Sequence, residues 1–179
     1  MQSGIPVYTA FETQTALEAI TGERTIALSP NKSCQIGSFT VIPFNVPHGT
    51  EIECYGYLIK HEEMGKLLFL TDLEYCKYDF SNQRVNHILC EVNYDMQFVN
   101  RDEPNYEHRL RGHMSLDTAL KFISTNDNPA LRNVVLIHLS DKSGDPALFK
   151  QRTEETVKYG ANVYIAEKGL EVDMNLCPF

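Results

Sequence analysis

Three side chains that bind divalent metals follow apolar segments of the sequence. His48 comes after VIPFNVP, Asp72 after KLLFLT, and His138 after NVVLI. Taken singly, an aspartate after a strand is typical of a turn, and a lone histidine is typical of a hydrogen-bonded structural group. Together, two imidazoles and one carboxylate suit Zn²⁺ and also Mn²⁺ or iron, and the two oxygens of a carboxylate can bridge two ions. The sequence therefore predicts a metal site formed by these three side chains.

Other polar residues lie close to these positions in the sequence. Glu91 and Asn93 follow the apolar run HILC, and Asp141 lies three residues after His138, so their side chains could orient the imidazoles through hydrogen bonds. Arg109 and Arg111 belong to a locally cationic stretch that also contains Arg101 and His108. This stretch could bind the phosphate of a substrate, and a solvated loop is the alternative interpretation.

Several motifs with known chemistry are incomplete or missing. The segment from His61 begins like the zinc-binding HExxH helix, but its fifth position is Gly65, so the second imidazole is absent. The five cysteines form no CxxC pair, which favours reduced thiols that pack as small apolar groups. The sequence also lacks a glycine-rich phosphate loop and a GxSxG nucleophile motif.

The elements that must position these residues change in character along the chain. We expect a short strand over 6–9 and an amphipathic helix over about 10–21, in which Ala10, Leu17 and Ile20 share a face and Gly22 ends the helix. Four segments with alternating or β-branched residues then predict adjacent strands: TIAL from Thr25, CQIGSFTVIPFNV, ECYGYLIK and KLLFLTD.

The second half alternates strands and helices. The runs 87–92 and 133–140 are apolar enough to be strands buried on both faces. Ser115 is placed to cap a helix that ends near Asn126, and Asp145 with Pro146 predicts a further helix to about Tyr159. The last segment, ANVYIAEKGLEVD, is expected to form two short strands. The whole pattern indicates an α/β or α+β fold with one domain over 1–179.

At this point the sequence resembles a known family. The order FTVIPFNVPHG, GYLI, LLFLTD, HILCEVNYD, GHMSLDTALKFI and VVLIHLSD is similar to the C-terminal part of the metallo-β-lactamase-fold hydrolases. The resemblance covers nearly the whole chain and is greatest to the bacterial and phage group related to tRNase Z, YycJ-like nucleases and cyclic-nucleotide phosphodiesterases. It implies an αββα sandwich, of which this chain would hold the second sheet, its helices and part of the first.

The resemblance also implies roles for individual residues. His48 and Asp72, which are 24 residues apart, and His138, 66 residues further on, match three metal-ligand positions of the family, with Asp72 as the bridging carboxylate. His113 matches a histidine that faces the substrate phosphate and acts as a general acid, whereas a helix-terminal imidazole bonded to the backbone is the alternative. The cofactor implied is a pair of Zn²⁺ or Mn²⁺ ions.

The chain departs from the family in one respect. The HxHxDH signature, which supplies further ligands, is absent from the 179 residues, so the sequence resembles a fold that is incomplete at its N-terminus. We therefore expect a weak or inactive phosphodiester hydrolase acting on a nucleotide or nucleic acid. The alternative is a catalytically dead remnant that serves as a binding or assembly module.

Composition limits the partners of the protein. The net charge of −8 disfavours broad attraction to nucleic acid or to an anionic membrane and mildly favours a small nucleotide substrate. No apolar run is long enough to span a membrane, and no signal peptide is recognisable, so we expect a cytoplasmic protein. An incomplete fold would expose the apolar face around FTVIPFNV and ECYGYLI, which predicts a homodimer or a higher oligomer.

Overall fold

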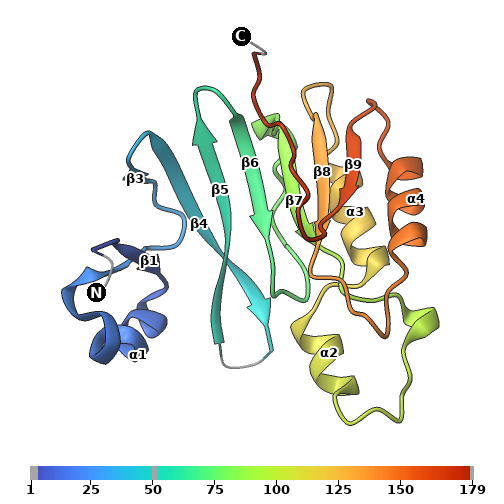
Figure 1. The fold of residues 1–179 in the computed structure, drawn as a ribbon, viewed down its shortest axis with the longest axis horizontal. Coiled ribbons are helices and arrows are strands. Elements are labelled where there is room, and N and C mark those ends of the chain that lie inside the picture. The colour runs from blue at the N-terminus through green and yellow to red at the C-terminus, as the bar shows by residue number, and fades with distance from the viewer. Residues whose placement is uncertain (1–3, 50–51, 178–179) are drawn as a thin grey trace.

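The computed structural model describes residues 4–49 and 52–177 as a mixed α/β fold with one large and one small sheet (Figure 1). The strands are β1 (Val7–Thr9), β2 (Thr25–Ala27), β3 (Cys34–Ile36), β4 (Phe39–His48), β5 (Ile52–His61), β6 (Gly65–Leu70), β7 (His87–Glu91), β8 (Asn133–Ile137) and β9 (Asn162–Ile165). The α-helices are α1 (Phe11–Thr21), α2 (Tyr106–Gly112), α3 (Leu116–Asn126) and α4 (Pro146–Thr156).

The large sheet has the strand order β3-β4-β5-β6-β7-β8-β9. Neighbours from β3 to β6 are antiparallel, and neighbours from β6 to β9 are parallel. Strands β4, β6, β7 and β8 therefore run in the same direction, so their carboxyl ends meet at one edge of the sheet. In Figure 1 this edge is the one beside α2. Ligand sites of open α/β sheets lie at such an edge.

The main core lies between this sheet and helices α3 and α4, which lie behind it in Figure 1. Leu68, Ile88, Leu136 and Phe149 are inaccessible to solvent and come from three neighbouring strands and α4. The caps that the sequence predicts are present. The Ser115 hydroxyl accepts a hydrogen bond from the Thr118 amide, and the Asp145 carboxylate accepts from the amides of residues 147 and 148.

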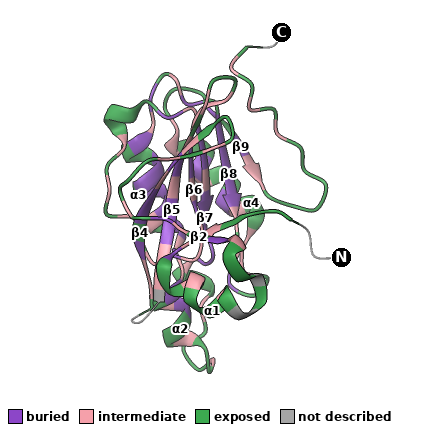
Figure 2. Ribbon diagram, turned by 90° about the vertical axis from the view of Figure 1, so that its left-hand side faces the viewer, coloured by how far each residue is buried: buried purple, intermediate pink, exposed green. Residues whose placement is uncertain are grey.

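The N-terminal unit, formed by β1, α1 and β2, packs on the opposite face of β5. Ala10 and Leu28 meet Tyr55 there in a second, small apolar cluster. The expected common face of α1 is not buried, because Ala10 is covered whereas Ile20 is 70% exposed. Figure 2 shows α1 coloured mainly as exposed.

Three features differ from the sequence prediction. The strand at Thr25 does not join the following strands but pairs in parallel with β1, as the small sheet. The segment CQIGSFTVIPFNV is two strands rather than one, because Gly37 has a φ of 60° and turns the chain between β3 and β4. The final segment forms only β9, and no second strand follows it within the described residues.

The apolar sheet face also differs from the expectation. β4 is paired on both sides, with β3 and β5, and the N-terminal unit covers part of β5. Large exposed apolar side chains occur instead on the N-terminal unit, where Ile5 is 68% and Phe11 65% exposed. Among the helices of the described residues, none is both long and apolar enough to cross a membrane.

Candidate metal centre

Four side chains with metal-binding atoms converge at the carboxyl edge of the parallel strands. They are Asp72, Glu91, His113 and His138, and one ligand atom of each lies within 4.8 Å of the others. Asp72 lies two residues beyond the end of β6, Glu91 is the last residue of β7, and His138 follows β8 directly. His113 comes from the end of α2. The four donors therefore come from segments that are far apart in the sequence.

Two of these residues have an unusual backbone conformation, which sets the direction of their side chains. Asp72 has a φ of 53° and His138 a φ of 59°, so both lie in the left-handed region that L-residues seldom adopt. Each chain turns sharply as it leaves its strand, and the side chain then points into the cluster instead of onto a face of the sheet. Such conformations persist only where surrounding contacts maintain them. At His138 one such contact is with Asn93, whose amide donates a hydrogen bond of 2.9 Å to the His138 carbonyl.

Glu91 lies at the centre of the cluster and is fully buried. Its Oε1 is 2.7 Å from Nδ1 of His113 and 3.3 Å from Nδ1 of His138, and its Oε2 accepts a hydrogen bond from the Leu73 amide. No lysine or arginine of the described residues pairs with this carboxylate. A buried carboxylate needs a compensating positive charge, which either an imidazolium or a bound cation can supply.

The hydrogen bond that His113 donates to Glu91 raises the pKa of His113, because its effect on the imidazole outweighs the opposing effect of burial. The Nδ1 proton is thus held by the carboxylate, and Nε2 is available either to bind a metal ion or to carry a second proton. Metal-binding histidines commonly have this arrangement, with the second ring nitrogen hydrogen-bonded to a carboxylate or a carbonyl.

The other side of the cluster is open to solvent. Nδ1 of His138 lies 3.4 Å from Oδ1 of Asp72, and the two side chains are 41% and 45% exposed. A set of two imidazoles and two carboxylates suits Zn²⁺ or Mn²⁺. The residues present therefore fit a divalent metal ion with one side accessible to a substrate.

His48 lies beside the four donors rather than among them. Its Nδ1 is 2.6 Å from the carbonyl of Gly112, and its ring centroid is 5.5 Å from that of His113. The contact with a carbonyl oxygen places the proton on Nδ1 and leaves Nε2 free. His48 thus has the hydrogen-bonding pattern of a metal ligand, although its ligand atoms lie outside the 4.8 Å group.

The remaining predicted site residues have different surroundings. The guanidinium of Arg109 is buried, 2.9 Å from Glu103 and 2.8 Å from the Ser143 hydroxyl. Arg111 is exposed and pairs with Glu107 on the same helix at 3.6 Å. Asp141 is exposed in the turn after β8 and contacts none of the four donors among the described residues. Asn93 reaches the backbone of His138 and not its imidazole.

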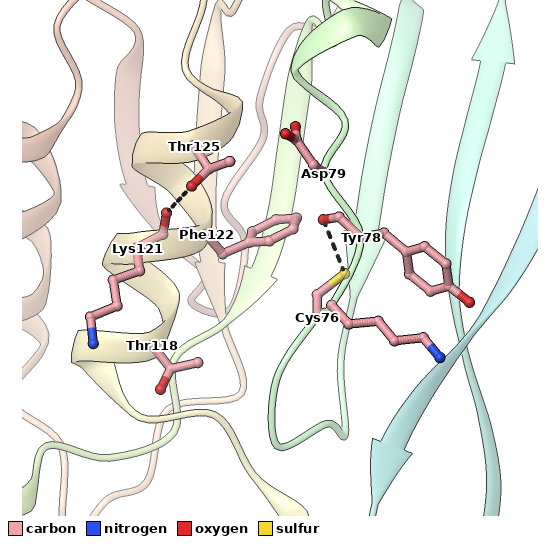
Figure 3. Close-up of a pocket in the computed structure, with 8 residues that line it drawn as sticks. Cys76, Tyr78, Asp79, Thr118, Lys121, Phe122 and Thr125 are labelled. Atoms are coloured by element: carbon pink, nitrogen blue, oxygen red, sulfur yellow. Dashed lines mark hydrogen bonds between the residues drawn. The ribbon is translucent and has the colours of Figure 1, made fainter.

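A pocket of about 270 Å³ adjoins the cluster. His113 and His138 line its inner side, and His108, Asn105, Asn93 and Ser140 line the rest. A second groove, of about 280 Å³, lies between α3 and the segment 76–79 and is lined by Lys121, Phe122 and Cys76 (Figure 3). That groove contains none of the four donors. A third pocket, of about 240 Å³, lies beside Asp72 and the N-terminal unit. The pocket beside His113 and His138 is the candidate substrate pocket, because two of the four donors line it.

Sequence reasoning treated Glu91 as a residue that orients the imidazoles, whereas its carboxylate lies within the donor group itself. Its position at the end of the buried strand HILCE was the available signal, since a charge in such a run needs a partner. No pattern in the sequence indicates that His108 lines the pocket, because this position depends on how α2 is placed in space.

Comparisons with known proteins place the fold. No family model matches the chain, and no curated protein matches it in sequence. The metallo-β-lactamase fold protein YhfI from Bacillus subtilis is similar in structure, with a TM-score of 0.69 and 18% identity over 92% of this chain and 63% of YhfI. This chain has the metallo-β-lactamase fold.

Two further structures are similar to this chain. Igni18, a metallo hydrolase from the archaeon Ignicoccus hospitalis, has a TM-score of 0.68 and 16% identity, covering 95% of this chain and 69% of Igni18. Yeast PDE1 has a TM-score of 0.66 and 19% identity, covering 92% of this chain and 58% of PDE1. The chain thus spans less than two thirds of YhfI and PDE1, and the predicted fold class is confirmed for the part it covers.

Proposed function

We propose that the protein is a metal-dependent hydrolase of phosphodiester bonds that acts on a nucleotide or nucleic acid, with low turnover in this chain alone. The observation that carries the proposal is the group of four metal-binding side chains at the carboxyl edge of a metallo-β-lactamase-like sheet. Structures similar to this one include yeast PDE1 and the short form of human tRNase Z. The fold alone permits other substrates, so the chemistry is argued from the site.

Asp72, Glu91 and His138 are the residues that would hold a Zn²⁺ or Mn²⁺ ion, with His48 beside them at a second position. Such an ion supplies charge neutralisation at the phosphate and an activated water. Asp72 and His138 are the exposed members of the cluster, so they form its substrate side. Glu91 is buried and keeps the two imidazoles in place through their Nδ1 atoms.

His113 is suited to proton transfer. Its Nδ1 proton is committed to Glu91, and the raised pKa favours the protonated imidazole, which carries a second proton on Nε2. This proton can pass to the leaving oxygen as the phosphodiester bond breaks. Glu91 then stabilises the remaining neutral imidazole in one orientation.

The size and charge of the molecule favour a small substrate. The pocket beside the cluster has a volume of only about 270 Å³, and the net charge of −8 opposes extended contact with a duplex backbone. A nucleotide, or the end of a single strand, meets both conditions.

A binding or assembly module remains the second candidate function. The exposed apolar residues of the N-terminal unit favour it. Such a protein could still bind the metal but would not turn over a substrate.

Hydrolysis of bis(p-nitrophenyl) phosphate with added Zn²⁺ or Mn²⁺ separates the two candidates. We expect slow hydrolysis that requires the metal and is lost in Asp72→Asn, whereas the exposed control Asp102→Asn retains it. Metal binding without hydrolysis above the metal-only blank would favour the module. Hydrolysis that survives Asp72→Asn would contradict the proposed site.

A further inference from the structure

Four imidazoles surround the entrance to the candidate metal centre, and we call them the imidazole cluster: His48, His108, His113 and His138. The ring centroid of His113 is 5.1 Å from that of His138, 5.5 Å from that of His48 and 5.8 Å from that of His108. His48 and His108 are 6.3 Å apart. Of the four residues, His108 is the one that lies within α2, and its side chain is exposed.

The four rings differ in how they are held. Nδ1 of His48 meets the Gly112 carbonyl, and the Nδ1 atoms of His113 and His138 meet Glu91. By contrast, neither ring nitrogen of His108 has a hydrogen-bond partner among residues 4–49 and 52–177. The rings of His48 and His113 are thus held by hydrogen bonds, and Nδ1 of His138 lies within 3.4 Å of two carboxylates. His108 keeps its hydrogen-bonding capacity for another molecule.

The arginines beside His108 are occupied elsewhere. Arg109 also lines the pocket, but its guanidinium is buried against Glu103 and Ser143. Arg111 is paired with Glu107 and is not among the residues that line the pocket. The contacts of the buried Arg109 guanidinium with Glu103 and with the buried Ser143 hold α2 in place, and this helix presents His108 to the pocket.

A substrate with a negatively charged phosphate needs a hydrogen-bond donor on the side of the pocket that α2 forms. Asp72 and Glu91 bring negative charge to the inner side of the site, and the amide of Asn93 is already bonded to the His138 carbonyl. The other polar side chains that line the pocket, Asn105 and Ser140, can supply neutral donors, and the imidazole of His108 on α2 can supply a further one. An imidazole with two unused nitrogens can donate to such an oxygen.

We propose that His108 is a substrate-binding residue that donates a hydrogen bond to a non-bridging oxygen of a phosphodiester held in the pocket between α2 and the metal-binding side chains. This inference rests on the proposed function, because it assigns the phosphate end of the same site. It identifies His108, rather than Arg109 or Arg111, as the anion-binding side chain of α2.

Dimethyl phosphate is a suitable probe, because it carries the phosphodiester anion and resists hydrolysis. It would be titrated into the Zn²⁺-loaded protein while the histidine side-chain signals are followed by nuclear magnetic resonance. We expect saturable shifts of the His108 signals in the wild type. His108→Ala should weaken the apparent affinity, read from the His113 signals, about 10-fold, as expected for a lost hydrogen bond to a charged group. His108→Asn, which keeps a donor, should recover part of the loss.

The matched control is Glu107→Gln, an exposed change at the adjacent position of α2, which should alter the affinity less than twofold. The proposal is overturned if the His108 signals do not move, or if His108→Ala binds dimethyl phosphate as the wild type does. Failure of the proposed function would give a different result. A wild-type protein that binds dimethyl phosphate at His108 but never hydrolyses bis(p-nitrophenyl) phosphate would contradict the proposed function and leave this inference intact.

Discussion

At the residue scale, the site depends on two residues in a backbone conformation that L-amino acids seldom adopt. Asp72 and His138 both have left-handed φ angles, just beyond the ends of β6 and β8, the two strands on either side of β7. For most residues this conformation costs about 1–2 kcal/mol, because Cβ approaches the following carbonyl oxygen. Because two such residues meet in one cluster, we infer that their backbone strain lowers the free energy of unfolding and that this strain orients the two side chains toward the cluster.

The cost can be measured at Asp72. We expect Asp72→Gly to be more stable than Asp72→Ala by about 1 kcal/mol in urea unfolding, because glycine adopts left-handed angles without strain. Thr71 provides a control with reversed sign. Its φ is not positive, so Thr71→Gly should be less stable than Thr71→Ala by about 0.5–1 kcal/mol. Equal stabilities of the two Asp72 variants would show that this backbone is not strained.

Removing the charge of Glu91 tests its part in metal binding. Glu91→Gln keeps the shape of the side chain but removes the negative charge that faces His113 and His138. We expect Zn²⁺ affinity, measured by competition with a chromophoric chelator, to fall about 10- to 100-fold. Glu107→Gln removes an exposed charge of the same kind and should leave the affinity unchanged. An unaltered affinity in Glu91→Gln would mean that Glu91 serves only as a buried partner of the imidazoles.

The sequence predicts the positions of Asp72 and His138 better than those of Glu91 and His108. Asp72 and His138 stand at the ends of clear apolar strands, and the structure brings them to 3.4 Å. Glu91 and His108 depend on the register of β7 and the placement of α2. These are long-range properties, which local patterns do not encode.

At the scale of elements, the sheet contains a close approach that only glycine permits. Gly56 of β5 lies opposite Phe44 of β4, and a Cβ at this position would be 2.5 Å from the Phe44 ring. The ring cannot easily move, because Tyr78 and Phe80 pack against it. We expect Gly56→Ala to destabilise the protein by about 1–3 kcal/mol in chemical denaturation. Gly4→Ala, where a Cβ meets open space, should have little effect, and a similar small effect at Gly56 would refute this packing argument.

The start of β7 contains a buried histidine whose ionisation opposes folding. His87 donates from Nε2 to the Met64 carbonyl and accepts at Nδ1 from the Asn133 side chain, so it is neutral. Burial lowers the pKa of His87, chiefly by desolvating the charged form. The unfolded chain therefore binds this proton more readily than the native protein does, beginning near pH 6.5.

The free energy of unfolding should thus be highest above about pH 6.5 and should fall as the pH drops through the lower folded pKa of His87. We expect His87→Gln to lose less stability between pH 7 and pH 5 than the wild type loses. His61→Gln, at the turn between β5 and β6, should retain the wild-type dependence. Identical pH dependence in His87→Gln and the wild type would exclude His87 as the cause.

Secondary structure was predicted well where a local signal exists and poorly where pairing decides. The caps at Ser115 and Asp145 and the apolar runs of β7 and β8 correspond to elements of the structure. The partner of the strand at Thr25 is β1, which no alternation of residues in TIAL could reveal. Helix α2 was missed because its seven residues are mostly polar and carry little periodicity.

At the scale of the whole molecule, strand direction explains why distant motifs meet. His48, Asp72, Glu91 and His138 all stand at or just beyond the carboxyl ends of four strands that run the same way. The segment with α2 then crosses this edge and adds His108 and His113. The resemblance to the fold placed Asp72 and His138 together, which the structure also does, whereas His48 lies outside the group of donors. Strand order and direction, which decide where these residues meet, are properties of the fold rather than of single residues.

The N-terminal unit gives the molecule a surface that suits association. Ile5, Phe11 and Ile20 are each at least 65% exposed and lie within one short stretch of chain, whereas the rest of the molecule is polar and acidic on average. Exposed large apolar side chains are found at interaction surfaces. We propose that a second copy of the chain covers these side chains, whereas the sequence-based expectation of a homodimer placed the contact on the face around FTVIPFNV and ECYGYLI.

Light scattering over a concentration series tests this association. We expect a species of twice 20.4 kDa whose stability is insensitive to salt, because an apolar contact is not screened by ions. Phe11→Asp places a charge in the middle of the surface and should shift the equilibrium to the monomer. Tyr159→Asp introduces the same charge at an exposed aromatic residue beyond α4 and should leave the dimer intact. A wild-type protein that stays monomeric at high concentration, or a dimer lost equally in both variants, would rule out the N-terminal unit as the interface.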